Sequence, residues 1–226
     1  MITLFLTWRA AASVPDGEAG RIAERLRTLP GLTRGLVFTA AAASDPFLND
    51  GPPPPLALQL YFADIAALEA ACGRSGALQA LADPTALPSL ASAVVTQQAM
   101  LARPYPVDDA AIAGEPWCSY LVAYPGPAAD FNLWLDFYLA HHPGIMRRFP
   151  GIREIEICTR LDWISFLPFG RDDAMQRNKV VFDSPAALDA ALNSPVRNEM
   201  RSDFHRFPPF AGGSTHYPML TRGIVP

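Results

Sequence analysis

Short apolar runs and amphipathic stretches alternate along this chain in an order that occurs twice. In the first half, runs rich in β-branched and aromatic residues predict four strands: Ile2–Trp8, Gly35–Ala42, Leu56–Phe62 and Ala93–Ala102. Apolar residues at helical spacing predict one helix after Asp16 and another over Ile65–Leu81. The second half predicts strands at Trp117–Tyr124, Arg153–Arg160, Asn178–Phe182 and Ser214–Thr221. Its two helices are expected to run from Asp130 to about His141 and from Ser184 to about Phe207.

Three pairs of similar segments support a tandem duplication. LPGL at Leu29 and FPGI at Phe149 lie 120 residues apart, as do LYFADIAALEAA at Leu60 and VVFDSPAALDAA at Val180. MLAR and MLTR near the ends of the halves are 119 apart. A constant offset in a constant order indicates an internal repeat. We therefore expect a degenerate repeat at 1–105, a linker at 106–116 and a second repeat, carrying the site, at 117–226.

The repeated order βαββαβ predicts the fold. Each unit corresponds to a ferredoxin-like α+β motif, with a four-stranded antiparallel sheet and two helices on one face. Two such units packed sheet to sheet would cover both bare faces within one chain.

Composition narrows the functional classes. Hydrophobic residues make up 50% and charged residues 18%, as in folded globular domains. The net charge of −4 and the lack of a Lys/Arg run argue against a nucleic-acid surface. Three cysteines far apart in sequence, Cys72, Cys118 and Cys158, suggest neither a disulfide framework nor a zinc site. No apolar run reaches the ~18–20 residues of a membrane span, so we expect a soluble cytoplasmic protein.

The stretch Phe131–Ile157 carries the candidate chemistry. Trp134, Tyr138 and His141 recur at i, i+4 and i+7, which places them on one stripe of a helix that Pro143 is expected to end or kink. An imidazole near neutral pKa suits general acid or base catalysis, and Tyr138 is one turn away to orient it. The alternative is that the stripe is a core face, with His141 bonded to a backbone carbonyl.

Further residues are candidates for shaping a pocket. Phe137 and Trp163 are expected to line it, and His205 would join if its helix faces His141. His142 is expected to be a solvent-facing neighbour of His141 and is included among the substrate-binding candidates. The apolar segment Asp162–Gly170 either covers the pocket or packs on a partner subunit. Metal-binding and phosphate-binding motifs are lacking, so neither a metal nor a cofactor is expected.

The second half resembles the EthD family of the dimeric α/β-barrel superfamily. The resemblance rests on Trp134, Tyr138 and His141-His142-Pro143, on the Pro150-Gly151 step, and on Asp203 and Phe204 in the late helix. Members of this family usually dimerise to close the barrel, so the resemblance implies an internal pseudo-dimer here. The superfamily includes isomerases, polyketide cyclases, cofactor-free monooxygenases, haem-degrading enzymes and members of no known activity.

These observations lead to a hypothesis and an alternative. The hypothesis is a cofactor-free enzyme acting on a small apolar or aromatic molecule, with His141 as acid/base and Tyr138 assisting. Trp134, Phe137 and Trp163 would shape its pocket, and two chains would still pair as a homodimer. The alternative is a non-catalytic small-molecule binding protein on the same barrel.

Overall fold

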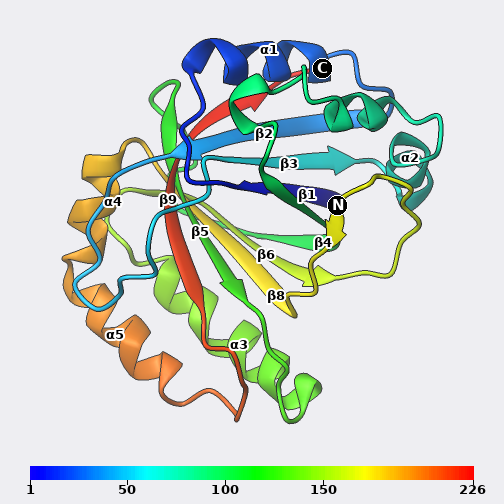
Figure 1. Ribbon diagram of the computed structural model, residues 1–226. Helices are drawn as coiled ribbons and strands as arrows, with labels where there is room; N and C mark the ends of the chain where they lie inside the picture. Colours follow the sequence, from blue (N-terminus) through cyan, green and yellow to red (C-terminus); the bar gives the residue numbers. More distant parts are fainter.

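The computed structural model describes all 226 residues, and its helices and strands follow the predicted double order (Figure 1). The first repeat has four strands, two α-helices and two short 3-10 helices: β1 (Ile2–Arg9), α1 (Asp16–Leu26), β2 (Leu32–Ala40), β3 (Leu56–Phe62), α2 (Ile65–Ala71), η1 (Ala77–Ala82), η2 (Pro88–Leu90) and β4 (Val94–Tyr105). The second has five strands, one of them very short, and three helices: β5 (Trp117–Tyr124), α3 (Phe131–Met146), β6 (Ile152–Arg160), β7 (Gly170–Arg171), β8 (Gln176–Phe182), α4 (Pro185–Leu192), α5 (Pro195–Phe204) and β9 (Thr215–Ile224).

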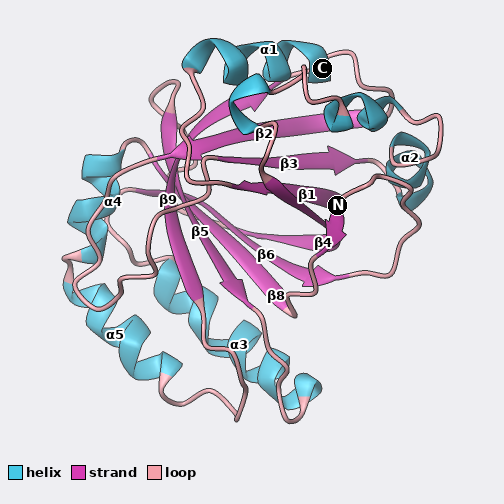
Figure 2. Cartoon of the chain, viewed as in Figure 1, coloured by secondary structure: helices cyan, strands magenta, loops and turns pink.

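Eight strands close into one antiparallel barrel. Their order is β1-β3-β2-β9-β5-β8-β6-β4, and β4 pairs again with β1 to close the ring. The last strand of each repeat pairs with the second strand of the other, β4 with β6 and β9 with β2. The helices lie outside the strands (Figure 2). The predicted α+β fold, two ferredoxin-like units forming an internal pseudo-dimer, is confirmed, and strand pairing between the repeats joins the two units into one barrel.

Local sequence explains where the elements begin and turn. The side chains of Asp130 and Ser184 accept hydrogen bonds from the third backbone N–H beyond them, at 3.0 and 3.1 Å, which caps α3 and α4. Gly31 and Gly151, at equivalent positions of the two repeats, have φ angles of 78° and 73°. Only glycine adopts this left-handed region at little cost, which accounts for the repeated Pro-Gly step.

Charged side chains, some buried and some partly exposed, meet where equivalent positions of the two repeats face each other. Arg34 binds Glu154 at 2.8 Å, and Lys179 lies 3.4 Å from Gln59. Each of these pairs joins positions 120 residues apart, so equivalent residues of the two repeats face each other. In a symmetric homodimer, a residue at such a position would face the identical residue of the partner subunit. At the Arg34–Glu154 position the two repeats are therefore complementary in charge, which favours pairing within the chain.

Lys179 is the centre of this network. It is 2% exposed and lies 3.0 Å from Glu154, 3.7 Å from Glu156 and 2.8 Å from the Tyr61 hydroxyl. Burial disfavours the charged form of Glu154, but Lys179 and Arg34 together lower the pKa of its carboxyl to about 2. The carboxylate therefore stays ionised inside the barrel.

None of the helices is long and apolar enough to cross a bilayer. The predicted cytoplasmic location stays a prediction, as do the predicted repeat boundaries and the homodimer.

Candidate functional site

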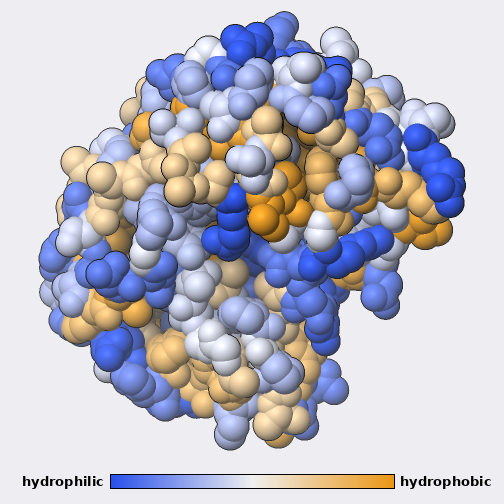
Figure 3. All heavy atoms as spheres, in the orientation of Figure 1, coloured by the Kyte–Doolittle hydropathy of each residue, from blue (hydrophilic) through white to orange (hydrophobic).

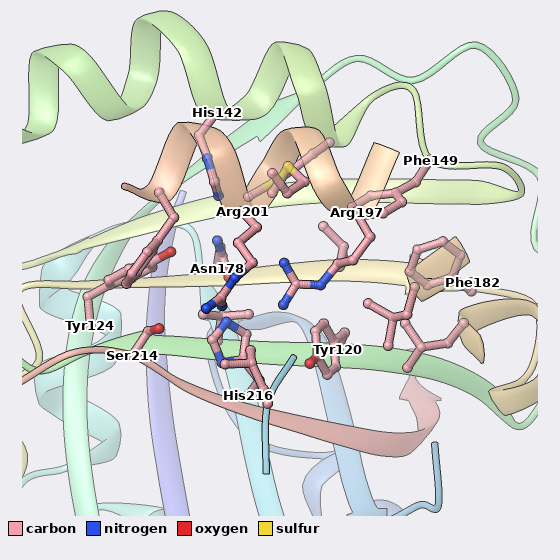
Figure 4. Close-up of a pocket in the computed structure, with 18 residues that line it drawn as sticks. Tyr120, Tyr124, His142, Phe149, Asn178, Phe182, Arg197, Arg201, Ser214 and His216 are labelled. Atoms are coloured by element: carbon pink, nitrogen blue, oxygen red, sulfur yellow. The ribbon is translucent and has the colours of Figure 1, made fainter. Parts of the chain in front are cut away.

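A cleft in the second repeat lies between helices α3, α4 and α5 and strands β5, β8 and β9 (Figure 4). It holds about 690 Å³ of space, counting the open solvent at its mouth. Twelve of its 18 lining residues are hydrophobic. Its polar and aromatic lining includes His142, Asn178, Arg197, Arg201, His216, Tyr120 and Tyr124. Alternation along β8 directs Asn178 to this cleft and Lys179 to the barrel interior.

His142 on α3 points into the cleft and is held by a buried carboxylate. Its ring is 4% exposed, and its Nδ1 lies 2.8 Å from Oδ2 of Asp203 on α5, which is 3% exposed. Burial lowers the pKa of His142, although the hydrogen bond and charge of Asp203 oppose that shift. The imidazole is therefore neutral at pH 7, with Nδ1–H donating to Asp203. Its other ring nitrogen, Nε2, is left as a proton acceptor on the cleft side.

The prediction that His141 faces the pocket was wrong, and so was the expectation that His142 faces solvent. His141 is exposed; its Nδ1 lies 2.8 Å from the Phe137 carbonyl oxygen, and its ring stacks on Phe137 at 4.2 Å. A residue advances 100° around a helix, so the buried stripe continues as Trp134, Tyr138 and His142 at i, i+4 and i+8. The helix also runs to Met146, with Pro143 in its last turn.

Trp134 and Tyr138 form the packed layer behind the cleft and do not line it. Both are fully buried, with ring centres 5.2 Å apart. The Tyr138 hydroxyl accepts a hydrogen bond from Nδ2 of Asn178, a cleft residue. Burial raises the pKa of Tyr138 well above its ordinary value, so this hydroxyl keeps its proton. Its place in the structure suits orienting Asn178, and it has no contact with the His141 ring.

Phe137 and His205 lie outside the cleft. Phe137 is half-buried beneath Arg206 and the His141 ring. His205 is exposed at the C-terminal end of α5 and does not line the cleft, although α5 packs against α3.

The Trp163 segment does not cover the cleft, and its contact with a partner subunit stays a prediction. It packs on the first repeat, where the backbone N–H of Phe166 donates to the Cys72 carbonyl and Trp163 and Phe169 lie against the first core. Arg171 covers the Trp163 ring at 3.7 Å. Trp163, Leu167 and Phe169 therefore complete the core of the other repeat, whereas Ile164 and Phe166 of the same loop are exposed.

Sequence reasoning missed the opposite wall of the cleft, which includes a loop of the first repeat. His216 on β9 lies 3.1 Å from Asp50, and Arg197 on α5 lies 2.9 Å from Asp45. The Tyr120 hydroxyl donates to Asp45 at 2.9 Å. Asp45 and Asp50 belong to the Pro-rich stretch between β2 and β3, more than 70 residues from any of these partners. No local spacing relates them, and only the closed barrel brings them together.

The first repeat has no equivalent site. Its apolar groove is lined by residues such as Trp8, Leu87, Leu90 and Phe169, with Asp83 as the one titratable group. On the face drawn in Figure 3, the largest group of hydrophobic atoms lies over the first repeat. The structure shows no group of three His, Cys, Asp or Glu side chains placed to hold a metal ion.

Comparison with known proteins supports the fold. No family model and no curated protein matches the chain. A solved anthrone oxidase-like protein matches 99% of this chain and 93% of its own, with 15% identity and a TM-score of 0.59. A Fusobacterium nucleatum protein, provisionally described as a monooxygenase, matches the same shares of both chains with 8% identity and a TM-score of 0.60. The chain has the dimeric α/β-barrel fold, with both halves of the barrel in one chain.

An EthD family protein from Bacillus halodurans matches about half of this chain. It covers 45% of this chain and 95% of its own, with 17% identity and a TM-score of 0.38. That likeness is too remote to assign the EthD family. The tandem duplication and the barrel are established by the strand order itself.

Proposed function

We propose that the cleft of the second repeat binds a small aromatic molecule and that His142 removes a proton from it without a cofactor. The observation that carries this proposal is the His142–Asp203 pair, a buried neutral imidazole held by a carboxylate on the wall of an apolar cleft. This assigns to His142 the acid/base role that the sequence suggested for its neighbour.

The chemistry follows from the geometry of that pair. Nε2 of His142 takes a proton from an acidic C–H or O–H of the substrate, and the electron pair left behind moves onto the substrate oxygen as an enolate or phenolate. Asp203 accepts the Nδ1 hydrogen bond throughout and neutralises the imidazolium that forms. Its other oxygen, Oδ1, has no hydrogen-bond partner and lies 3.9 Å from the Arg206 guanidinium, so the one hydrogen bond of the Asp203 carboxylate goes to the imidazole. The apolar lining excludes water and favours flat rings.

The full-length likeness to an anthrone oxidase-like protein suggests a probe. Anthrone has an acidic C–H between two aromatic rings, and reaction of its enolate with O₂ gives anthraquinone and water. We expect the protein to accelerate the exchange of that hydrogen for deuterium in anaerobic D₂O, followed by NMR, over the buffer rate. Adding O₂ then tests whether the enolate is oxidised. Binding of anthrone without faster exchange would contradict the proposal and favour the non-catalytic binding protein.

The same proposal predicts how the rate depends on pH. The base must be neutral, so the rate falls as pH drops through the pKa of His142. Because burial lowers that pKa, the fall should lie below pH 6.5, the ordinary value for histidine. Asp203 raises the pKa, so Asp203→Asn should move the fall to still lower pH as well as reduce the plateau. If the rate of the wild-type protein falls with dropping pH at a midpoint above pH 7, His142 is excluded as the base.

A further inference from the structure

The charged side chains that line the cleft are cationic or imidazole groups. Arg197, Arg201, His142 and His216 line it, whereas Asp45 and Asp50, which bind Arg197 and His216, are not among its lining residues. Arg197 is neutralised by Asp45 at 2.9 Å. Arg201 forms no ion pair; its guanidinium lies over the Phe47 ring, 5.0 Å from the ring centre. Figure 4 shows Arg201 extending from α5 into the cleft toward His216. A cation without a counter-ion thus faces an apolar space.

Asn178 supplies a second, independent indication of a ligand. Its side chain is 4% exposed and lines the cleft from β8. Nδ2 donates to the Tyr138 hydroxyl, whereas Oδ1 is buried and has no hydrogen-bond partner. Buried carbonyl oxygens are rarely left unpaired in folded proteins, because the missing bond is costly. A donor on a bound molecule would complete this amide.

We propose that the substrate is a hydroxylated aromatic carboxylate whose carboxylate binds Arg201 and whose hydroxyl donates to Asn178. The inference rests on the proposed function in placing the substrate in the same cleft as His142. A guanidinium presents paired N–H donors that match the two oxygens of a carboxylate, and the pairing is strengthened in a water-poor site. The apolar lining contacts the rings, and the two polar groups set which ring atom lies at Nε2 of His142.

Matched probes test the charge. We expect 2-naphthoate to bind the wild-type protein at pH 7.5 at least about tenfold more tightly than 2-naphthamide, its neutral counterpart, by calorimetric titration. Arg201→Met should remove that preference. Arg148→Met should keep it, because Arg148 is exposed, pairs with Glu199 and does not line the cleft. Equal affinity of the two probes, or no binding of 2-naphthoate at millimolar concentration, would overturn the proposal.

A second pair of probes tests the hydroxyl. At least one of 3-hydroxy- and 6-hydroxy-2-naphthoate should bind more tightly than 2-naphthoate, by about fivefold or more. Asn178→Leu should abolish that gain. The comparison of ligands in the wild-type protein stands even if this variant does not fold. Failure of both hydroxy isomers to gain affinity would overturn the hydroxyl assignment, and none of these titrations depends on proton exchange at His142.

Discussion

Replacing His142 with Gln is expected to slow the catalysed deuterium exchange of anthrone by about 10²–10⁴-fold, the usual contribution of a general base. The glutamine amide can still donate to Asp203 but has no basic nitrogen for the substrate. His141→Gln should change the rate by less than about twofold, since His141 is exposed and bonded to its own helix. Initial rates at pH 7.5, measured by NMR at saturating anthrone, give the comparison.

The two variants control for each other. They differ by one position on the same helix, so a general loss of α3 would affect both. Circular dichroism and the urea midpoint should be closer to the wild type for His141→Gln, because His142 is buried. A rate loss in His141→Gln alone would restore the assignment made from the sequence, and an unchanged rate in His142→Gln would refute the base proposed here.

Replacing Lys179 with Met is expected to lower the free energy of unfolding by about 3–5 kcal/mol, because it leaves a buried acid without its partner. Glu156 is 1% exposed and would lose the ammonium 3.7 Å away, while Glu154 would keep only Arg34. Urea unfolding at pH 7, followed by tryptophan fluorescence, measures the change.

An exposed ion pair on the same barrel gives the control. Arg160 binds Asp173 at 3.1 Å, with their side chains 49% and 84% exposed. Arg160→Met should therefore cost no more than about 1 kcal/mol. Adding Glu156→Gln to Lys179→Met should restore part of the loss, since the buried charge is then removed. Equal costs for Lys179→Met and Arg160→Met would show that the interior network contributes no more than a surface pair.

The fold was predictable because the duplication leaves marks that need no knowledge of contacts. The Pro-Gly steps at Gly31 and Gly151 and the constant offset of 120 residues fix the repeat and its order of elements. What the sequence could not specify was the use of β4 and β9 as strands shared between repeats. Pairing between strands depends on register over long separations, and hydrophobic periodicity within one strand does not encode it.

The sequence predicted the correct helix for the site but the wrong one of its two histidines. His141 and His142 differ by 100° on α3, and Trp134 and Tyr138 alone leave both within reach of one stripe. The continued i+4 spacing to His142 was the available signal. Asp50 and His216 are 166 residues apart, so their contact carried no local signature. The Trp163 segment was misplaced because apolar composition predicts burial without saying against which surface.

Lys179 is also the single lysine of the chain, and the barrel encloses it. Apart from the N-terminal amine, the folded protein therefore presents almost no amine to amine-directed reagents. A lysine-specific protease has one cleavage site, which becomes accessible only when the barrel unfolds. Cleavage by such a protease would report global opening with a single product pair.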